Sequence, residues 1–181
     1  MNKRVAIIPI LVFFLSILCS CKDNIPEDGN TTTIVRFPSS VEKIEENRRD
    51  FIDSIPSSDY TLLFYLGSSQ CTSCTIKHIH PLEGLYKKTH DYHNFSMVVL
   101  ISPKQEEYEM LDSMLIQLGL RFPVYIDLDS TFEEINPNIF ETPGLRQCIL
   151  NVRKEPVLTG DPLSSDDVWN KYVEFMNNHG R

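Results

Sequence analysis

The residues with the clearest chemical potential are two cysteines, Cys71 and Cys74, which are separated by Thr72 and Ser73. They follow a continuous apolar run over residues 60–66, which predicts a strand buried on both faces. A helix is predicted to begin at the cysteines. Amide groups at a helix N-terminus and the helix dipole stabilise a thiolate. We therefore predict that Cys71 is a nucleophile that attacks a disulfide sulfur, and that Cys74 resolves the mixed disulfide.

The periodicity of the chain predicts alternating strands and helices around this motif. Strands are expected over residues 31–37, 60–66, 97–101, 122–126, 147–152 and 156–159. Helical segments are expected over residues 41–52, from 71 to about 89, and over 105–118, 131–135 and 166–177. This order predicts an α/β domain with a mixed sheet and helices on both faces.

The order of elements, with a CxxC between the first central strand and its helix, resembles the thioredoxin fold. The strand at residues 148–151, the polar turn, residues 156–160 and the last helix also resemble that family, as in the periplasmic cytochrome-maturation and peroxiredoxin-related groups. The resemblance covers residues 35–178. It implies a three-layer α/β/α domain in which Cys71 and Cys74 are the catalytic residues of thiol–disulfide exchange. It implies no bound cofactor, because electrons would come from a partner protein.

Several positions depart from the family pattern. Gln70 stands where the family has a tryptophan, and Tyr65 stands where thioredoxin buries a proton-relay aspartate. Aligning Asn151 with the family's acidic residue puts Leu145 at the position of the family's cis-proline. Pro143 is the nearest proline and is the alternative candidate for that role.

Two other functions fit the same cysteines. Cys71 and Cys74 could form a structural disulfide in a non-catalytic binding or scaffold module. His78 follows Cys74 by four residues and His80 lies two further on, so the two thiolates and these imidazoles could instead bind copper or zinc. Cys148 lies in a hydrophobic strand, where a buried cysteine acts as a small apolar residue; the other interpretation is a third redox cysteine.

The N-terminus has the features of a secretory signal. Lys3 and Arg4 precede an apolar run over residues 5–18, which is short for a bilayer span. The following sequence, ending at Cys21, resembles the bacterial lipobox, in which cleavage leaves an acylated cysteine. We therefore expect a signal peptide over residues 1–20, an acylated N-terminus and tether over 21–30, and a domain over 31–181. Lys22 after the lipidated position favours the outer membrane of a Gram-negative envelope.

The composition limits the partners. The 181 residues suit one domain, and the formal net charge of −8 disfavours binding to nucleic acid. No glycine-rich phosphate loop is present in the sequence, so no nucleotide cofactor is expected. The expected partners are envelope proteins that carry thiols or disulfides, together with the membrane that the N-terminal lipid enters.

Overall fold

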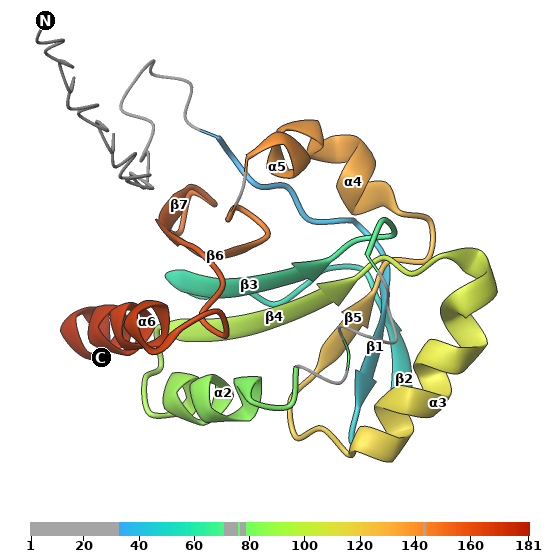
Figure 1. Cartoon of the computed structure of the whole chain (residues 1–181), viewed down its shortest axis with the longest axis horizontal. Helices are drawn as coiled ribbons and strands as arrows, with labels where there is room; N and C mark the ends of the chain where they lie inside the picture. Colours follow the sequence, from blue (N-terminus) through green and yellow to red (C-terminus); the bar gives the residue numbers. More distant parts are fainter. Residues whose placement is uncertain (1–32, 71–75, 77–78, 143) are drawn as a thin grey trace, which may run out of the picture. The chain divides into compact units, whose positions relative to one another are not determined.

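A mixed seven-stranded sheet is the centre of the described part of the chain, with strand order β2-β1-β5-β4-β3-β6-β7 (Figure 1). The computed structural model describes residues 33–181, with the exception of 71–75, 77–78 and 143. The strands are β1 (Val41–Glu45), β2 (Arg48–Ile52), β3 (Tyr60–Leu66), β4 (Phe95–Ile101), β5 (Val124–Ile126), β6 (Gln147–Leu150) and β7 (Pro156–Thr159). The central strands β3, β4 and β5 are parallel, whereas the outer strands pair antiparallel.

Helices cover both faces of this sheet. The helical segments are α2 (Leu82–His90), η1 (Gln105–Glu107), α3 (Tyr108–Leu118), α4 (Thr131–Ile135), α5 (Pro137–Glu141) and α6 (Asp166–His179). Helices α2, α3 and α6 pack on one face, and α4 and α5 pack on the other (Figure 1). None of the helices in the described part of the chain is long and apolar enough to cross a membrane. The predicted α/β class, with helices on both faces, is confirmed.

Strand β3 separates two apolar cores, because its successive side chains point to opposite faces. Leu62 and Phe64 contribute to the core under α2, α3 and α6. Leu63 and Tyr65 contribute to the core under α4 and α5. With both faces covered, every position from Thr61 to Leu66 is buried. This is why the segment is apolar throughout, and the predicted strand is confirmed at both ends.

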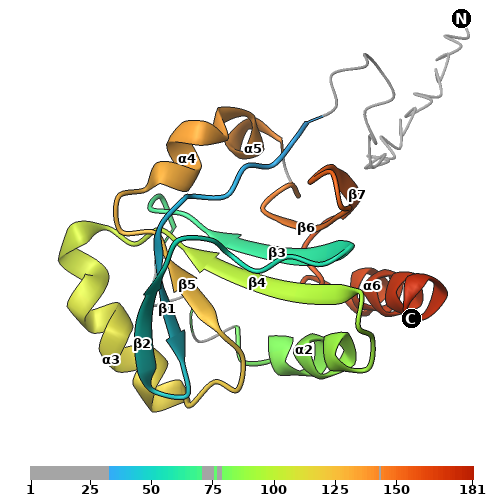
Figure 2. The ribbon, with the colours of Figure 1, turned by 180° about the vertical axis from the view of Figure 1, so that it is seen from behind.

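The predicted helix over residues 41–52 is wrong. The segment is a β-hairpin in which β1 pairs with β2 and with β5 (Figure 2). The two turn residues, Glu46 and Asn47, have φ values of 48° and 62°, as a two-residue hairpin turn requires. Many charged side chains suggested a solvated helix, but four of the five β2 positions are exposed because β2 is an edge strand. Glu42, in contrast, is buried under the hydroxyl of Tyr108, which donates a hydrogen bond of 2.6 Å to it.

Two further predictions need correction. The described part of the predicted strand at residues 31–37 is not a strand; the N–H of Val35 donates one hydrogen bond, to the carbonyl of Lys154 at 2.9 Å. Strands β2 and β7 already occupy the two sheet edges, and the buried Val35 lies in the core of the α4 face. The continuous helix predicted from residue 71 to about 89 is interrupted, because residue 79 is a bend, residues 80–81 are turns and α2 begins at Leu82. Pro81 has no N–H to continue the helical hydrogen bonds of the preceding residues.

The remaining elements are confirmed with shifted ends. The helix predicted at 105–118 begins as the 3₁₀ turn η1 and continues as α3, which ends at Gly119 with φ 56°. The strand predicted at 122–126 is shortened to β5, and the strand at 147–152 ends at Leu150. The final helix runs two residues past the predicted end. Helix α5 was not predicted.

Candidate functional site

The turn that leads into the CxxC motif is closed by two hydrogen bonds. After β3 ends at Leu66, the N–H of Gln70 donates to the carbonyl of Gly67 at 3.0 Å. The N–H of Gly67 donates to the side-chain Oε1 of Gln70 at 3.2 Å. The side chain and the backbone of Gln70 therefore both close the turn. Cys71 is the next residue in the sequence, so the motif follows this turn directly.

Glu133, on α4, holds this turn from the other face of the sheet. Its Oε1 accepts hydrogen bonds from the Tyr65 hydroxyl at 2.8 Å and from the N–H of Ser68 at 3.0 Å. Its Oε2 accepts a hydrogen bond from Ser68 Oγ at 3.1 Å. Gly67 permits this approach, because a Cβ there would lie 2.5 Å from Glu133 Oε1. These three hydrogen bonds fix Ser68, three residues before the motif begins.

Tyr65 is neutral in this arrangement. Its side chain is fully buried, and burial raises the pKa of the Tyr65 hydroxyl far above its ordinary value, with the nearby Glu133 carboxylate adding to the rise. The hydroxyl therefore remains a hydrogen-bond donor at any physiological pH. Where thioredoxin buries an aspartate, this chain places a neutral donor whose acceptor is a carboxylate from another element.

Ser102 and Asp127 connect the ends of the parallel strands β3, β4 and β5. The N–H of Ser102, just after β4, donates to the carbonyl of Leu66 at 2.9 Å, and Ser102 Oγ donates to Asp127 Oδ2 at 3.0 Å. Asp127 also accepts the N–H groups of Thr131 and Phe132 at 3.1 and 2.8 Å, which anchors the start of α4. Both Ser102 and Asp127 are buried. Helix α4, which carries Glu133, is thereby fixed at the same end of the sheet as the turn.

A groove of about 670 Å³ lies on the α2 and α6 face, at the end of β3. Among the residues that the structure describes, its lining comes from the end of β3, the start of α2, the start of β6 and the loop before α6. These residues are Phe64, Leu66, Ile79, Pro81, Leu82, Gln147, Asp161, Pro162, Leu163, Ser165, Asp166 and Trp169. Leu66 and Ile79 lie just before and just after the stretch that contains the CxxC. The groove can therefore hold part of a molecule that reaches the motif.

The segment before β6 lies against the end of β3. The N–H of Tyr65 donates to the carbonyl of Arg146 at 2.8 Å. Leu145, aligned with the family's cis-proline, is buried in the core of the α4 face. Gly144 has φ 88°, and its carbonyl accepts the N–H of Gly160 at 3.2 Å. A leucine thus occupies the aligned position; Pro143 lies outside the described residues.

Most of the predicted site residues also lie outside the described residues. These are Cys21, Cys71, Cys74 and His78. Their predicted roles in lipidation, thiol exchange or metal binding remain predictions. His80 is described and is exposed. In the described part of the chain, no three His, Cys, Asp or Glu side chains are grouped to hold a metal ion.

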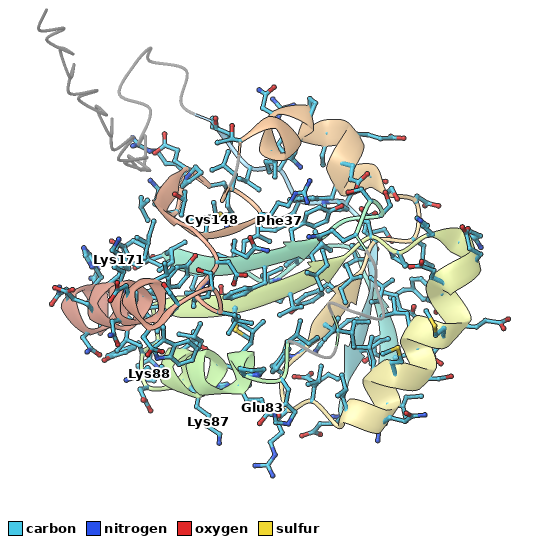
Figure 3. All side chains as sticks on the ribbon, in the orientation of Figure 1. Phe37, Glu83, Lys87, Lys88, Cys148 and Lys171 are labelled. Carbon is cyan, nitrogen blue, oxygen red and sulfur yellow. The ribbon has the colours of Figure 1, made fainter. Side chains whose placement is uncertain are left out.

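Cys148 is a buried free thiol with no accessible surface. Burial raises its pKa to about 12, so the thiol stays protonated and unreactive at neutral pH. In Figure 3, Cys148 lies at β6, on the side of the sheet away from α2 and its labelled side chains Glu83 and Lys87. The interpretation as a small apolar core residue is confirmed, and a redox role is disfavoured.

Sequence reasoning missed Glu133, Ser102 and Asp127. The available signal was positional: Ser102 follows the predicted strand 97–101, and Asp127 follows the predicted strand 122–126. Carboxyl ends of neighbouring parallel strands meet at one sheet edge, so polar residues there are candidates for a common site. Nothing in the sequence around Glu133 indicates its contact with Tyr65, which spans 68 positions.

Comparison with known proteins supports the fold. No protein-family model matches the sequence, and no curated protein matches it. Among solved structures, the thioredoxin domain of a thiol-disulfide oxidoreductase from Bacteroides vulgatus is similar with a TM-score of 0.53 at 13% identity, covering 82% of this chain and 99% of that one. A thioredoxin-like protein from Porphyromonas gingivalis has a TM-score of 0.49 at 13% identity and covers 82% of this chain and 97% of its own. The chain has a thioredoxin-like fold.

Proposed function

We propose that this chain carries out thiol–disulfide exchange through Cys71 and Cys74. The observation that carries the proposal is the place of the motif, which directly follows a hydrogen-bonded turn at the end of the central strand of a thioredoxin-like sheet. The adjoining groove gives a partner protein a surface to contact. Similar solved proteins are named as thiol-disulfide oxidoreductases, which agrees with this role.

The exchange balances without a bound cofactor. The Cys71 thiolate attacks one sulfur of a partner's disulfide, which forms a mixed disulfide and releases the partner's other sulfur as a thiolate. The Cys74 thiolate then attacks the sulfur of Cys71, which forms the Cys71/Cys74 disulfide and releases the second partner sulfur. Two electrons pass from the cysteine pair to the partner, and protons from water complete its two thiols. A dithiol protein regenerates the reduced pair by the reverse reaction.

Reduction of insulin disulfides tests this proposal. Cys71→Ala is expected to abolish the reduction, because no nucleophile remains, and Cys74→Ala to trap the mixed disulfide. Cys148→Ala is the control and should keep the rate, because the native thiol is inaccessible. Full activity of Cys71→Ala would instead favour a structural disulfide in a binding or scaffold module.

We infer that Cys21 is lipidated and tethers the domain to the envelope membrane, where it meets proteins with thiols or disulfides. The support is the apolar run over residues 5–18 followed by the sequence that resembles a lipobox. Metabolic labelling with palmitate should mark the protein, and Cys21→Ala should lose the label and leave the membrane fraction. Label retained by Cys21→Ala would contradict lipidation at this residue.

A further inference from the structure

We propose that the groove at the end of β3 binds partner segments that carry a cationic side chain near their disulfide. Asp161 and Asp166 provide this charge preference. This inference rests on the thiol–disulfide exchange proposed above and names its substrate class. Among the described residues that line the groove, these two carboxylates are the only charged groups, and all the others are apolar or neutral.

Asp161 is held in place by its own loop. Its Oδ1 accepts the N–H of Leu163 at 2.9 Å. Its carbonyl accepts the N–H and the hydroxyl of Ser164 at 3.0 and 2.6 Å. Asp161 is exposed, and no described Lys, Arg or His forms an ion pair with it. Its side chain is therefore held at the groove and forms no ion pair with the described cations.

Asp166 adds a second carboxylate in the first turn of α6. The residue before it, Ser165, caps the helix by accepting the N–H of Val168 at 3.4 Å. Asp166 is exposed, and the described cations form no ion pair with it either. Two carboxylates without a described cation as ion-pair partner attract a cationic partner group and repel an anionic one.

The groove wall suits the stem of a long cationic side chain. Trp169 packs against α2 at Gly84, where a Cβ would lie 3.1 Å from the indole ring. The ring, together with Leu82 and Leu163, contributes apolar lining to the same groove as the two carboxylates. Lysine and arginine bury their methylene stems on such surfaces while the charged end stays near carboxylates or an aromatic face.

An extended peptide is the occupant that fits the position of the groove. Leu66 and Pro81 both line it, and they bracket the chain segment that contains the motif. A peptide segment that binds in the groove can therefore carry the disulfide that reacts with Cys71. The net charge of −8 favours the approach of cationic partners over a longer range.

Three matched peptides test the charge preference. Each carries one cysteine as a disulfide with 2-mercaptoethanol and differs only in one neighbouring residue, which is Arg, Gln or Glu. The reduced wild-type protein should react with the Arg peptide about tenfold faster than with the Glu peptide at low salt, and salt should weaken this ratio. The ratio should fall towards one in Asp161→Asn and Asp166→Asn.

Asp167→Asn is the matched control, because it removes an equal charge from the same turn of α6 but does not line the groove. It should keep the wild-type ratio. Equal wild-type rates for the Arg and Glu peptides, or an unchanged ratio in Asp161→Asn and Asp166→Asn, would overturn the inference. Failure of the wild type to reduce the Gln peptide contradicts the exchange function instead.

A binding measurement keeps the inference testable without exchange. Trp169 is the one tryptophan in the sequence, so its fluorescence reports directly on the groove. Peptides with serine in place of cysteine should change this fluorescence at lower concentration when they carry Arg than when they carry Glu. Asp166→Asn should reduce that difference, and equal titration curves for the two peptides in the wild type would overturn the inference.

Discussion

The Tyr65 hydroxyl donates a hydrogen bond of 2.8 Å to Glu133 Oε1, which connects the central strand to α4. The same carboxylate accepts the backbone and side-chain donors of Ser68, in the turn that leads to the CxxC. The position that holds a buried acid in thioredoxin here holds a neutral donor, and the acid comes from another element. Glu133 therefore connects the buried end of β3 to the turn that precedes the motif.

Tyr65→Phe should lower the free energy of unfolding by about 1–3 kcal/mol. The substitution deletes a partly buried hydrogen bond from the buried Tyr65 to a carboxylate with little change in shape. Urea unfolding measures the loss. The matched control is Tyr92→Phe, whose lost hydrogen bond to Asn177 is exposed and should cost less than about 1 kcal/mol. Equal losses of unfolding free energy in the two variants would show that the hydrogen bond to Glu133 stabilises the fold no more than an exposed one.

Gly67→Ala should displace Glu133 from the turn. The new Cβ would lie 2.5 Å from Glu133 Oε1 and 3.0 Å from the Tyr65 ring. Such overpacking costs about 1–3 kcal/mol of unfolding free energy. In combination with Glu133→Ala, the cost of Gly67→Ala should fall, because the clashing carboxylate is gone. Strict additivity of the two substitutions contradicts the close approach.

The buried thiol of Cys148 should make stability fall at alkaline pH. Its pKa is about 12 in the folded domain, against a reference value of 9.0. The unfolded chain therefore loses this proton at lower pH than the folded chain. The thiol's contribution is complete below pH 9 and is lost as the pH rises from 9 towards 12.

Urea unfolding at pH 8 and at pH 10.5 measures this contribution. Between these values the wild type should lose about 2 kcal/mol more than Cys148→Ala. Buried tyrosines are present in both proteins and cancel in the comparison. The same pH dependence in both proteins would mean that the thiol titrates normally.

Asn47→Ala should destabilise the β1–β2 hairpin by about 1 kcal/mol. Asn47 has φ 62°, a conformation that alanine adopts only with strain. Asn47→Gly is the control and should be tolerated, because glycine takes this conformation freely. Thermal unfolding of both variants provides the comparison. If Asn47→Gly were less stable than Asn47→Ala, the left-handed conformation of Asn47 in the turn would be contradicted.

The segments that could be predicted from sequence are those whose pattern follows from burial. Strand β3 is apolar throughout because both faces are covered, and α6 shows a helical period because it buries Tyr172 and Met176 on one side. The hairpin at residues 41–52 could not be recognised, because its edge strand is polar and its turn carries Glu46 and Asn47 without glycine. Local charge there was a poor guide to structure.

Only those parts of the candidate site that are formed by residues close together in the sequence could be predicted. Cys71 and Cys74 are recognisable by spacing and by the strand before them. Glu133 reaches the turn through tertiary contacts with Tyr65 and Ser68, 68 and 65 positions away. The groove likewise joins residues from β3, α2 and the loop before α6. No local pattern encodes contacts that arise only when the sheet assembles.

The equilibrium reduction potential of the Cys71/Cys74 pair tests the central claim most directly. It is measured on the full chain in glutathione or dithiothreitol buffers by thiol trapping, with Cys148→Ala as a check that the buried thiol does not contribute. Exchange activity predicts a potential between about −120 and −270 mV, the span of dedicated thiol oxidants and reductants. A potential well below about −300 mV would identify a structural disulfide and contradict the proposed function.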